Sequence, residues 1–155
     1  MAAQIWVDAD ACPAEIKTLI FRMSQRLQAP VCLVANRPMH IPSSSQATLV
    51  CVPKEPDAAD HYIVQRVAPR DIVITADIPL AAACVNKQAR VISPRGEVFT
   101  AANIHERLAV RNLMHDLRAS GMELGGPAPF KPQDRQKFAE ALNRALTQSE
   151  RPGNP

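Results

Sequence analysis

Residues 5–20 read IWVDADACPAEIKTLI and combine the parts of one repeating structural unit. The apolar run Ile5–Val7 is continuous rather than alternating, which is typical of a strand covered on both faces of a sheet. Two aspartates follow it, and then comes Pro13, a residue that favours the first turn of a helix. From there to Leu27, apolar residues recur at steps of three and four, which predicts an amphipathic helix. The stretch therefore predicts a strand–helix unit with acids at its junction.

The same unit recurs along the chain. Further apolar runs occupy residues 31–34, 49–52, 72–74 and 91–92, and helical patterns occupy residues 58–67, 79–85, 103–119 and 134–146. Strands that alternate with helices favour a parallel sheet with helices on both faces. We therefore expect a single three-layer α/β domain with a mainly parallel central sheet over residues 1–147, followed by a flexible tail at 148–155.

Three segments carry specific expectations. The helix at 103–119 is expected to turn its apolar residues inward, namely Val110, Leu113, Met114 and Leu117. The Pro- and Ser-rich segment 37–46 is expected to be a loop between two strands. Residues 120–132, which contain three glycines and three prolines, are expected to be irregular.

The composition is that of an ordinary globular domain. The chain has 155 residues, of which 46% are hydrophobic and 21% charged. It contains no run of about 18 apolar residues, so no membrane span is expected. The net charge of +3 permits a nucleic-acid partner without favouring one. The 4 cysteines are widely spaced and lack zinc-ligand spacing, so a reducing cytoplasm is the simplest expected location.

Several aspartates follow predicted strands or open predicted helices. They are Asp8, Asp10, Asp57, Asp60 and Asp77. In a parallel sheet with right-handed connections, the carboxyl ends of the strands and the starts of the following helices share one edge, where such folds bind ligands. We therefore expect these carboxylates to converge on one edge of the sheet.

The competing interpretation is that these aspartates are helix caps. Because proline favours the first helical position, Pro79 predicts a cap at Ile78, which places Asp77 too early in the chain to serve. The same reasoning applies to Asp10. Asp57 remains a good candidate for a plain cap.

Metal binding accounts for the acids better than a purely structural cluster does. Crowded carboxylates repel one another and raise each other's proton affinity. A Mg²⁺ or Mn²⁺ ion relieves that repulsion, because it prefers hard oxygen ligands. No basic residue lies in the local runs around Asp8 or Asp77 to neutralise them instead. All the aspartates named above are therefore candidate metal ligands.

Three residues on the same expected edge are candidates for substrate binding. Asn36 and Arg37 end a predicted strand, and a guanidinium group is well suited to hold a phosphate. The alternative for Arg37 is a solvated loop arginine. Thr75 could orient a water molecule or a substrate oxygen, although a threonine at a strand end often serves only as a strand former.

A basic helical face is a further candidate for substrate binding. Arg107, Arg111 and Arg118 fall within about 40° of one another on a helical wheel. Such stripes bind phosphate backbones. A charged helix face is often only solvated, however, and Glu106 and Asp116 dilute this one.

Two stretches that contain the acids resemble the signatures of the bacterial YaiI/YqxD family. They are VDADACP at 7–13 and DIVITADIPLAA at 71–82. The resemblance extends in order over nearly the whole chain, through DAAD at 57–60, SPRGE at 93–97, GGP at 125–127 and DR at 134–135. The departures are small: Ala14 follows the first proline, where the family often has a larger residue.

The family is poorly characterised and is similar to PIN-like nuclease domains, in which acids at strand ends bind Mg²⁺ or Mn²⁺ and cleave phosphodiester bonds. The resemblance implies that Asp8 is the acid after the first strand and Asp77 the acid after the fourth. Asp60, supported by Asp57, matches the acid borne on a helix, and Asp10 has a less certain counterpart. The implied activity is metal-dependent hydrolysis of RNA or DNA, with Asp8, Asp10, Asp60 and Asp77 as the catalytic residues.

Two other functions compete with the nuclease. The D-x-D order also suits a phosphatase of the haloacid-dehalogenase kind, with Asp8 as nucleophile and Asp10 as general acid. Against it, Pro13 begins a helix where that class inserts a flap. A PIN-like domain can also be a non-catalytic RNA- or protein-binding module. A thiol nucleophile at Cys12 is disfavoured, because it has no partner base and neighbouring acids raise its pKa.

Overall fold

The computed structural model describes residues 3–42, 46–126 and 128–150. The first half of the chain forms β1 (Ile5–Asp8), the short 3-10 helix η1 (Ala9–Ala11), α1 (Ala14–Leu27), β2 (Val31–Ala35), β3 (Ala47–Cys51) and α2 (Ala58–Arg66). The second half forms β4 (Ile72–Ile74), α3 (Ile78–Asn86), β5 (Arg90–Ile92), β6 (Val98–Phe99), α4 (Ile104–Ala119) and α5 (Pro132–Glu150). Strands and helices thus alternate much as predicted.

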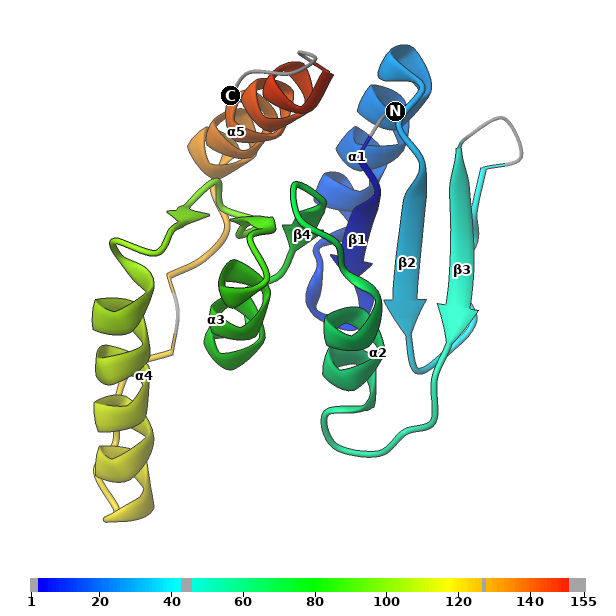
Figure 1. The fold of residues 1–155 in the computed structure, drawn as a ribbon. Coiled ribbons are helices and arrows are strands. Elements are labelled where there is room, and N and C mark those ends of the chain that lie inside the picture. The colour runs from blue at the N-terminus through cyan, green and yellow to red at the C-terminus, as the bar shows by residue number, and fades with distance from the viewer. Residues whose placement is uncertain (1–2, 43–45, 127, 151–155) are drawn as a thin grey trace.

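One six-stranded sheet, in the order β3-β2-β1-β4-β5-β6, organises the molecule (Figure 1). The strands β1 to β5 are parallel, and β6 runs antiparallel to β5. In the centre, Val7 of β1 pairs with Leu33 of β2 and with Ile74 of β4. This register brings the carboxyl ends of the three central strands to one edge, as the sequence predicted.

Successive residues of the strands enter two separate cores, so the domain has three layers. Ile5 and Val7 face α1 and α5, where they pack with Ile20 and Phe138. Trp6 faces the opposite side, where α2 and α3 cover the sheet. The predicted three-layer α/β architecture with a mainly parallel sheet is confirmed, and the strands β2 and β4 are apolar along their length because both of their faces are covered.

The described residues of the connection between the parallel strands β2 and β3 form no helix, as the Pro- and Ser-rich segment predicted. Met39 and Ile41 of this connection pack against the core on the α1 side. Residues 43–45 lie outside the described residues. The loop thus takes part of the place that a crossover helix would cover in a regular βαβ unit.

The helix α4 forms where it was predicted but does not bury the predicted face. Its first residue, Ile104, is 2% exposed, whereas Val110, Leu113 and Met114 are 42%, 57% and 39% exposed. The prediction that these three face inward is wrong, and only Leu117 is half-buried. Figure 1 shows the reason: α4 follows the last strand and stands outside α3, and no other described helix or strand covers its far side.

The carboxyl-terminal helix is longer than predicted. The expected helix covered 134–146, whereas α5 runs from Pro132 to Glu150 and so takes in the first residues of the predicted tail. The remaining residues of that tail, 151–155, lie outside the described residues. None of the described helices is long and apolar enough to cross a membrane.

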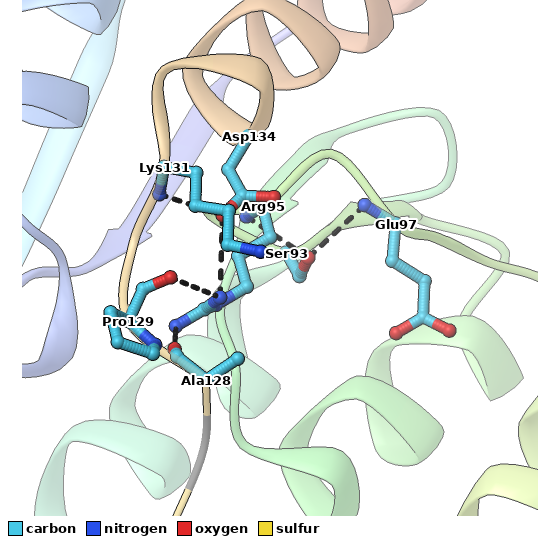
Figure 2. A network of polar contacts seen from close by, with 7 residues as sticks. All are labelled: Ser93, Arg95, Glu97, Ala128, Pro129, Lys131 and Asp134. Atoms are coloured by element: carbon cyan, nitrogen blue, oxygen red, sulfur yellow. Dashed lines mark hydrogen bonds and ion pairs between the residues drawn. The ribbon is translucent and has the colours of Figure 1, made fainter.

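One arginine ties the turn after β5 to the chain segment that leads into α5 (Figure 2). Arg95 donates from Nη1 to Oδ2 of Asp134 at 3.3 Å and to the carbonyl of Pro129 at 3.4 Å, and from Nη2 to the carbonyl of Ala128. The hydroxyl of Ser93 closes the turn by accepting the backbone N–H of Arg95 at 3.2 Å. Ser93, Arg95 and Asp134, from the SPRGE and DR stretches, therefore take part in one structural contact.

Gly96 lets α5 approach the same turn closely. Its φ of +86° is a conformation that suits glycine. A Cβ atom at this position would lie 2.6 Å from the backbone carbon of Lys137 and 2.7 Å from the backbone nitrogen of Phe138. No larger side chain fits here without moving α5. We call the contact between residues 93–97 and the start of α5, with residues 128–131, the α5 seam.

Candidate functional site

The predicted aspartates line a single cavity at the carboxyl edge of the sheet. The cavity has a volume of about 200 Å³, and its wall includes Asp8, Asp10, Asp57, Asp60 and Asp77. They come from the end of β1, from η1, from the N-cap and the first turn of α2, and from the N-cap of α3. The fold thus brings together all of the acids that the sequence selected, which we call the acid cavity.

A hydrogen bond from the buried Thr75 holds Asp8 in place. The Thr75 hydroxyl donates to Oδ2 of Asp8 at 2.9 Å and accepts the backbone N–H of Asp77 at 3.0 Å. Thr75 is only 1% exposed, so its hydroxyl positions these two acids rather than contacting a substrate. Burial raises the pKa of Asp8, and the charges of Asp77 and Asp10 raise it further, whereas the Thr75 hydrogen bond lowers it.

Asp77 is the N-cap of α3, contrary to the prediction. Its Oδ1 accepts the backbone N–H of Leu80 at 2.9 Å. The helix begins at Ile78, one residue before Pro79, so the proline occupies the second helical position and not the first. This one bond leaves Oδ2 of Asp77 without a hydrogen bond among the described residues.

Asp57, predicted to be a plain cap, makes no side-chain capping bond to α2. Its backbone has φ +64° and ψ 11°, a left-handed conformation that is uncommon for a residue other than glycine. Aspartate tolerates it better than most residues. The carboxylate of Asp57 therefore remains available to the acid cavity, and the backbone strain is compatible with a functional position.

Asp60, in the first turn of α2, is half-buried among other acids. Burial raises the pKa of Asp60 to about 6, and the charges of Asp77, Asp8 and Asp57 add to the rise. No cation among the described residues is placed to cancel this effect, apart from a small contribution from His61. The cavity thus concentrates negative charge that the protein leaves largely uncompensated.

Asp10 lies at the rim, with Asn36 and Arg37 as its partners. The backbone N–H of Asn36 donates to Oδ2 of Asp10 at 2.8 Å. Nε of Arg37 lies 3.8 Å from Oδ1 of Asp10, and the arginine side chain is 65% exposed. Asn36 and Arg37 therefore lie on the predicted edge, with the arginine free to turn towards a bound anion.

One acid of the cavity was missed by the sequence reasoning. Glu55 lines the acid cavity together with Val52 and Pro53, in the turn between β3 and α2. It stands in a polar stretch that resembles an ordinary surface loop. Its position just after a predicted strand, two residues before Asp57, was the signal that could have identified it.

The carboxylates of the acid cavity suit a hard divalent cation. In the described residues, however, they do not lie close enough together to coordinate one. Carboxylate oxygens are the ligands that Mg²⁺ and Mn²⁺ prefer. Among the described residues, no three His, Cys, Asp or Glu side chains converge closely enough to hold a metal ion. A metal at this site would therefore need the carboxylates to move closer together than they stand here.

The remaining candidates lie outside the acid cavity. Arg107 is on α4, and its Nη2 pairs with Oε1 of Glu97 at 2.9 Å. Arg111 is exposed on the same helix. Burial raises the pKa of the Cys12 thiol to about 12, so the thiol stays protonated and is a poor nucleophile.

Comparison with known proteins identifies relatives over the whole domain. The family model described as "Uncharacterized BCR, YaiI/YqxD family" matches residues 6–148. A UPF0178 protein of Bordetella petrii is 52% identical over 95% of this chain and 98% of its own. UPF0178 proteins of Trichlorobacter lovleyi and of Geobacter sp. strain M21 are 51% and 49% identical, over 92% and 98% of this chain and 93% and 99% of their own. The chain therefore belongs to the YaiI/YqxD family.

Proposed function

We propose that this protein is a divalent-metal-dependent nuclease that hydrolyses phosphodiester bonds of RNA or DNA. The observation that carries the proposal is the gathering of aspartates from separate chain segments around one cavity at the carboxyl edge of a parallel sheet. Such an edge is the usual ligand site of this fold class. Burial raises the pKa values of Asp8 and Asp60, and the charges of neighbouring acids add to the rise, so a bound cation would stabilise the ionised carboxylates.

The acids are suited to hold Mg²⁺ or Mn²⁺. Asp8, Asp60 and Asp77 would be the central ligands, with Asp10 and Asp57 as further oxygen donors. A bound ion of this kind neutralises phosphate charge and lowers the pKa of a coordinated water, so that no side-chain nucleophile is needed.

The other residues of the site orient the acids and the substrate. Thr75 fixes the carboxylate of Asp8, and the backbone N–H of Asn36 fixes that of Asp10. The exposed guanidinium of Arg37, at the rim, is placed to hold a phosphate of the nucleic acid. Asp60 ionises fully only above about pH 6, so we expect metal binding and activity to increase from pH 5 to pH 8.

The proposal is tested by calorimetric titration of Mn²⁺ and Mg²⁺ into the wild-type protein and an Asp8→Asn/Asp77→Asn variant. Asparagine is as good an N-cap as aspartate, so the change at Asp77 preserves the start of α3. Asp116→Asn, an exposed change on α4, is the matched control for lost charge. We expect saturable binding in the wild type and the control, and none in the double variant.

The same three proteins are then incubated with labelled RNA and DNA. Cleavage that requires Mn²⁺ or Mg²⁺ and disappears only in the double variant supports the nuclease. Binding of nucleic acid without cleavage would favour the non-catalytic module instead. Covalent trapping of Asp8 by a beryllium fluoride phosphate mimic would favour the phosphatase. If the wild type binds neither ion, the metal-dependent mechanism is wrong.

A further inference from the structure

A second cavity lies at the opposite end of α3 from the acids. Its volume is about 520 Å³, within the range of about 300–1,000 Å³ that is usual for small-molecule sites. The end of α3, strands β5 and β6, and one face of α5 enclose it. Because α3 has 9 residues, its length of about 13 Å separates this cavity from the acid cavity. We call it the α5 cleft.

The cleft exists because α5 presents small side chains towards the edge of the sheet. Phe138 and Leu142 fill the core completely, with exposures of 0%. Ala141 and Ala145, one helical turn apart, line the cleft instead and leave room beside Ile92 and Phe99. The inner wall of the cleft is therefore apolar and suits an apolar ligand body.

The edge of the sheet beside the cleft is closed to an added strand. Asn103 donates from Nδ2 to the carbonyl of Val98 at 2.9 Å, and its Oδ1 accepts the backbone N–H of Thr100 at 2.8 Å. The asparagine thereby satisfies the carbonyl of Val98 in β6 and the N–H of Thr100 just after it, which a pairing peptide strand would need. Val98 is nevertheless 39% exposed at the mouth of the cleft. These contacts favour a small molecule over an extended peptide.

The charges that face the cleft are positive. Arg90 donates from Nη1 to the carbonyl of Ala145 at 2.9 Å, which fixes its guanidinium. Arg144 lines the cleft and has no hydrogen-bond or ion-pair partner among the described residues. None of the described residues that line the cleft is an aspartate or glutamate.

We propose that the α5 cleft binds a small organic anion with an apolar body. The apolar part lies against Ala141, Ala145 and Phe99, and the anionic head group meets Arg144 at the mouth. This binding site goes beyond the proposed nuclease activity and does not depend on it, because the two cavities share no lining residue.

The test uses octanoate as the probe, with octanol and octylammonium as neutral and cationic molecules of the same chain length. Each is titrated into the full chain while backbone amide signals are followed by NMR. We expect octanoate to shift the signals of residues 98–101 and 141–148, with an affinity at least about tenfold higher than that of octanol or octylammonium.

Variants on the rim of the cleft locate the head group. Arg144→Gln is expected to weaken octanoate binding about tenfold and to leave octanol binding within about twofold. Arg111→Gln, which removes the same charge from α4, is the matched control and should change neither. Val98→Asp, which places a negative charge at the mouth, should weaken octanoate binding more than octanol binding. The Asp8→Asn/Asp77→Asn variant should bind octanoate as the wild type does.

Three results would overturn the proposal. The first is octanol binding as tightly as octanoate, since Arg144 would then not contribute to binding of the anionic head group. The second is octanoate-induced shifts confined to α4 or to the acid cavity. The third is a shift of the cleft signals with protein concentration alone, which would show that a second copy of the chain occupies the cleft.

Discussion

The acid cavity and the α5 seam both contain charged side chains, yet they use charge in opposite ways. At the seam, Arg95 meets the carboxylate of Asp134 and two backbone carbonyls, so its charge is satisfied. In the acid cavity, the pKa values of Asp8 and Asp60 are raised by burial and by neighbouring acids. Charges that stabilise a fold are paired, whereas charges left in mutual repulsion indicate that a binding partner is needed.

The largest expected effect tests how tightly the seam is packed. Gly96→Ala should destabilise the protein by about 3 kcal/mol, because the added Cβ collides with the backbone of α5. Urea denaturation measures the loss. The control is Gly121→Ala, where φ is +95° but nothing lies within 4 Å, and only about 1 kcal/mol of backbone strain is expected. An equal loss of stability in the two variants would mean that α5 can move away from the added Cβ at little cost.

The Thr75 hydroxyl holds two acids of the acid cavity, and removing it should destabilise the protein less than the glycine change does. Thr75→Val keeps the shape of the side chain but leaves Asp8 and the backbone N–H of Asp77 without a partner. We expect a loss of about 2 kcal/mol and a severalfold weaker affinity for Mn²⁺. Thr18→Val, at an exposed hydroxyl on α1, should change neither. Unchanged Mn²⁺ affinity in a folded Thr75→Val protein would remove Thr75 from its positioning role.

The seam's ion pair should contribute less again, because Arg95 is 39% exposed. Arg95→Met is expected to destabilise the protein by about 1 kcal/mol through the lost hydrogen bonds. For comparison, Arg135→Met breaks the exposed pair with Glu15 and should cost under about 0.5 kcal/mol. Thermal and urea unfolding of the two variants measure the difference. If Arg95→Met left the stability unchanged, the paired charge at the seam would not stabilise the fold.

The smallest expected effect is a gain in stability rather than a loss, and it comes from a change at Asp60. Because the pKa of Asp60 rises from 3.8 to about 6 on folding, the native state holds its proton more tightly than the unfolded state does. Stability should therefore fall as pH increases from about 4 to about 6 and stay reduced above that range. Asp60→Asn should remove this decrease and stabilise the protein by about 0.5 kcal/mol at pH 7.5, a modest gain because solvent screens the half-exposed carboxyl.

Urea unfolding of the wild type and Asp60→Asn from pH 4 to pH 8 measures this change. Asp116→Asn serves as the control, since its carboxylate is exposed on α4 and should not alter the pH profile. If the difference in stability between the wild type and Asp60→Asn stayed constant from pH 4 to pH 8, the pKa of Asp60 would not be raised on folding.

Helices α1 and α4 show where sequence patterns stop being informative. Both carry apolar residues at helical spacing. Ile16 and Ile20 of α1 are 0% and 1% exposed, whereas Leu113 of α4 is 57% exposed. The pattern predicts which residues share a side of the helix, but only the order of layers determines whether anything covers that side.

The sequence by itself determined the α/β class, the parallel sheet, and the edge on which Asp8, Asp60 and Asp77 meet. It did so because the period of apolar residues and the handedness of strand connections are local or nearly universal constraints. Only the tertiary structure decided that Asp77 caps α3, that Glu55 joins the cavity, and that Thr75 lies behind Asp8. Those assignments depend on helix boundaries shifted by one residue and on side chains from distant segments, which no local pattern encodes.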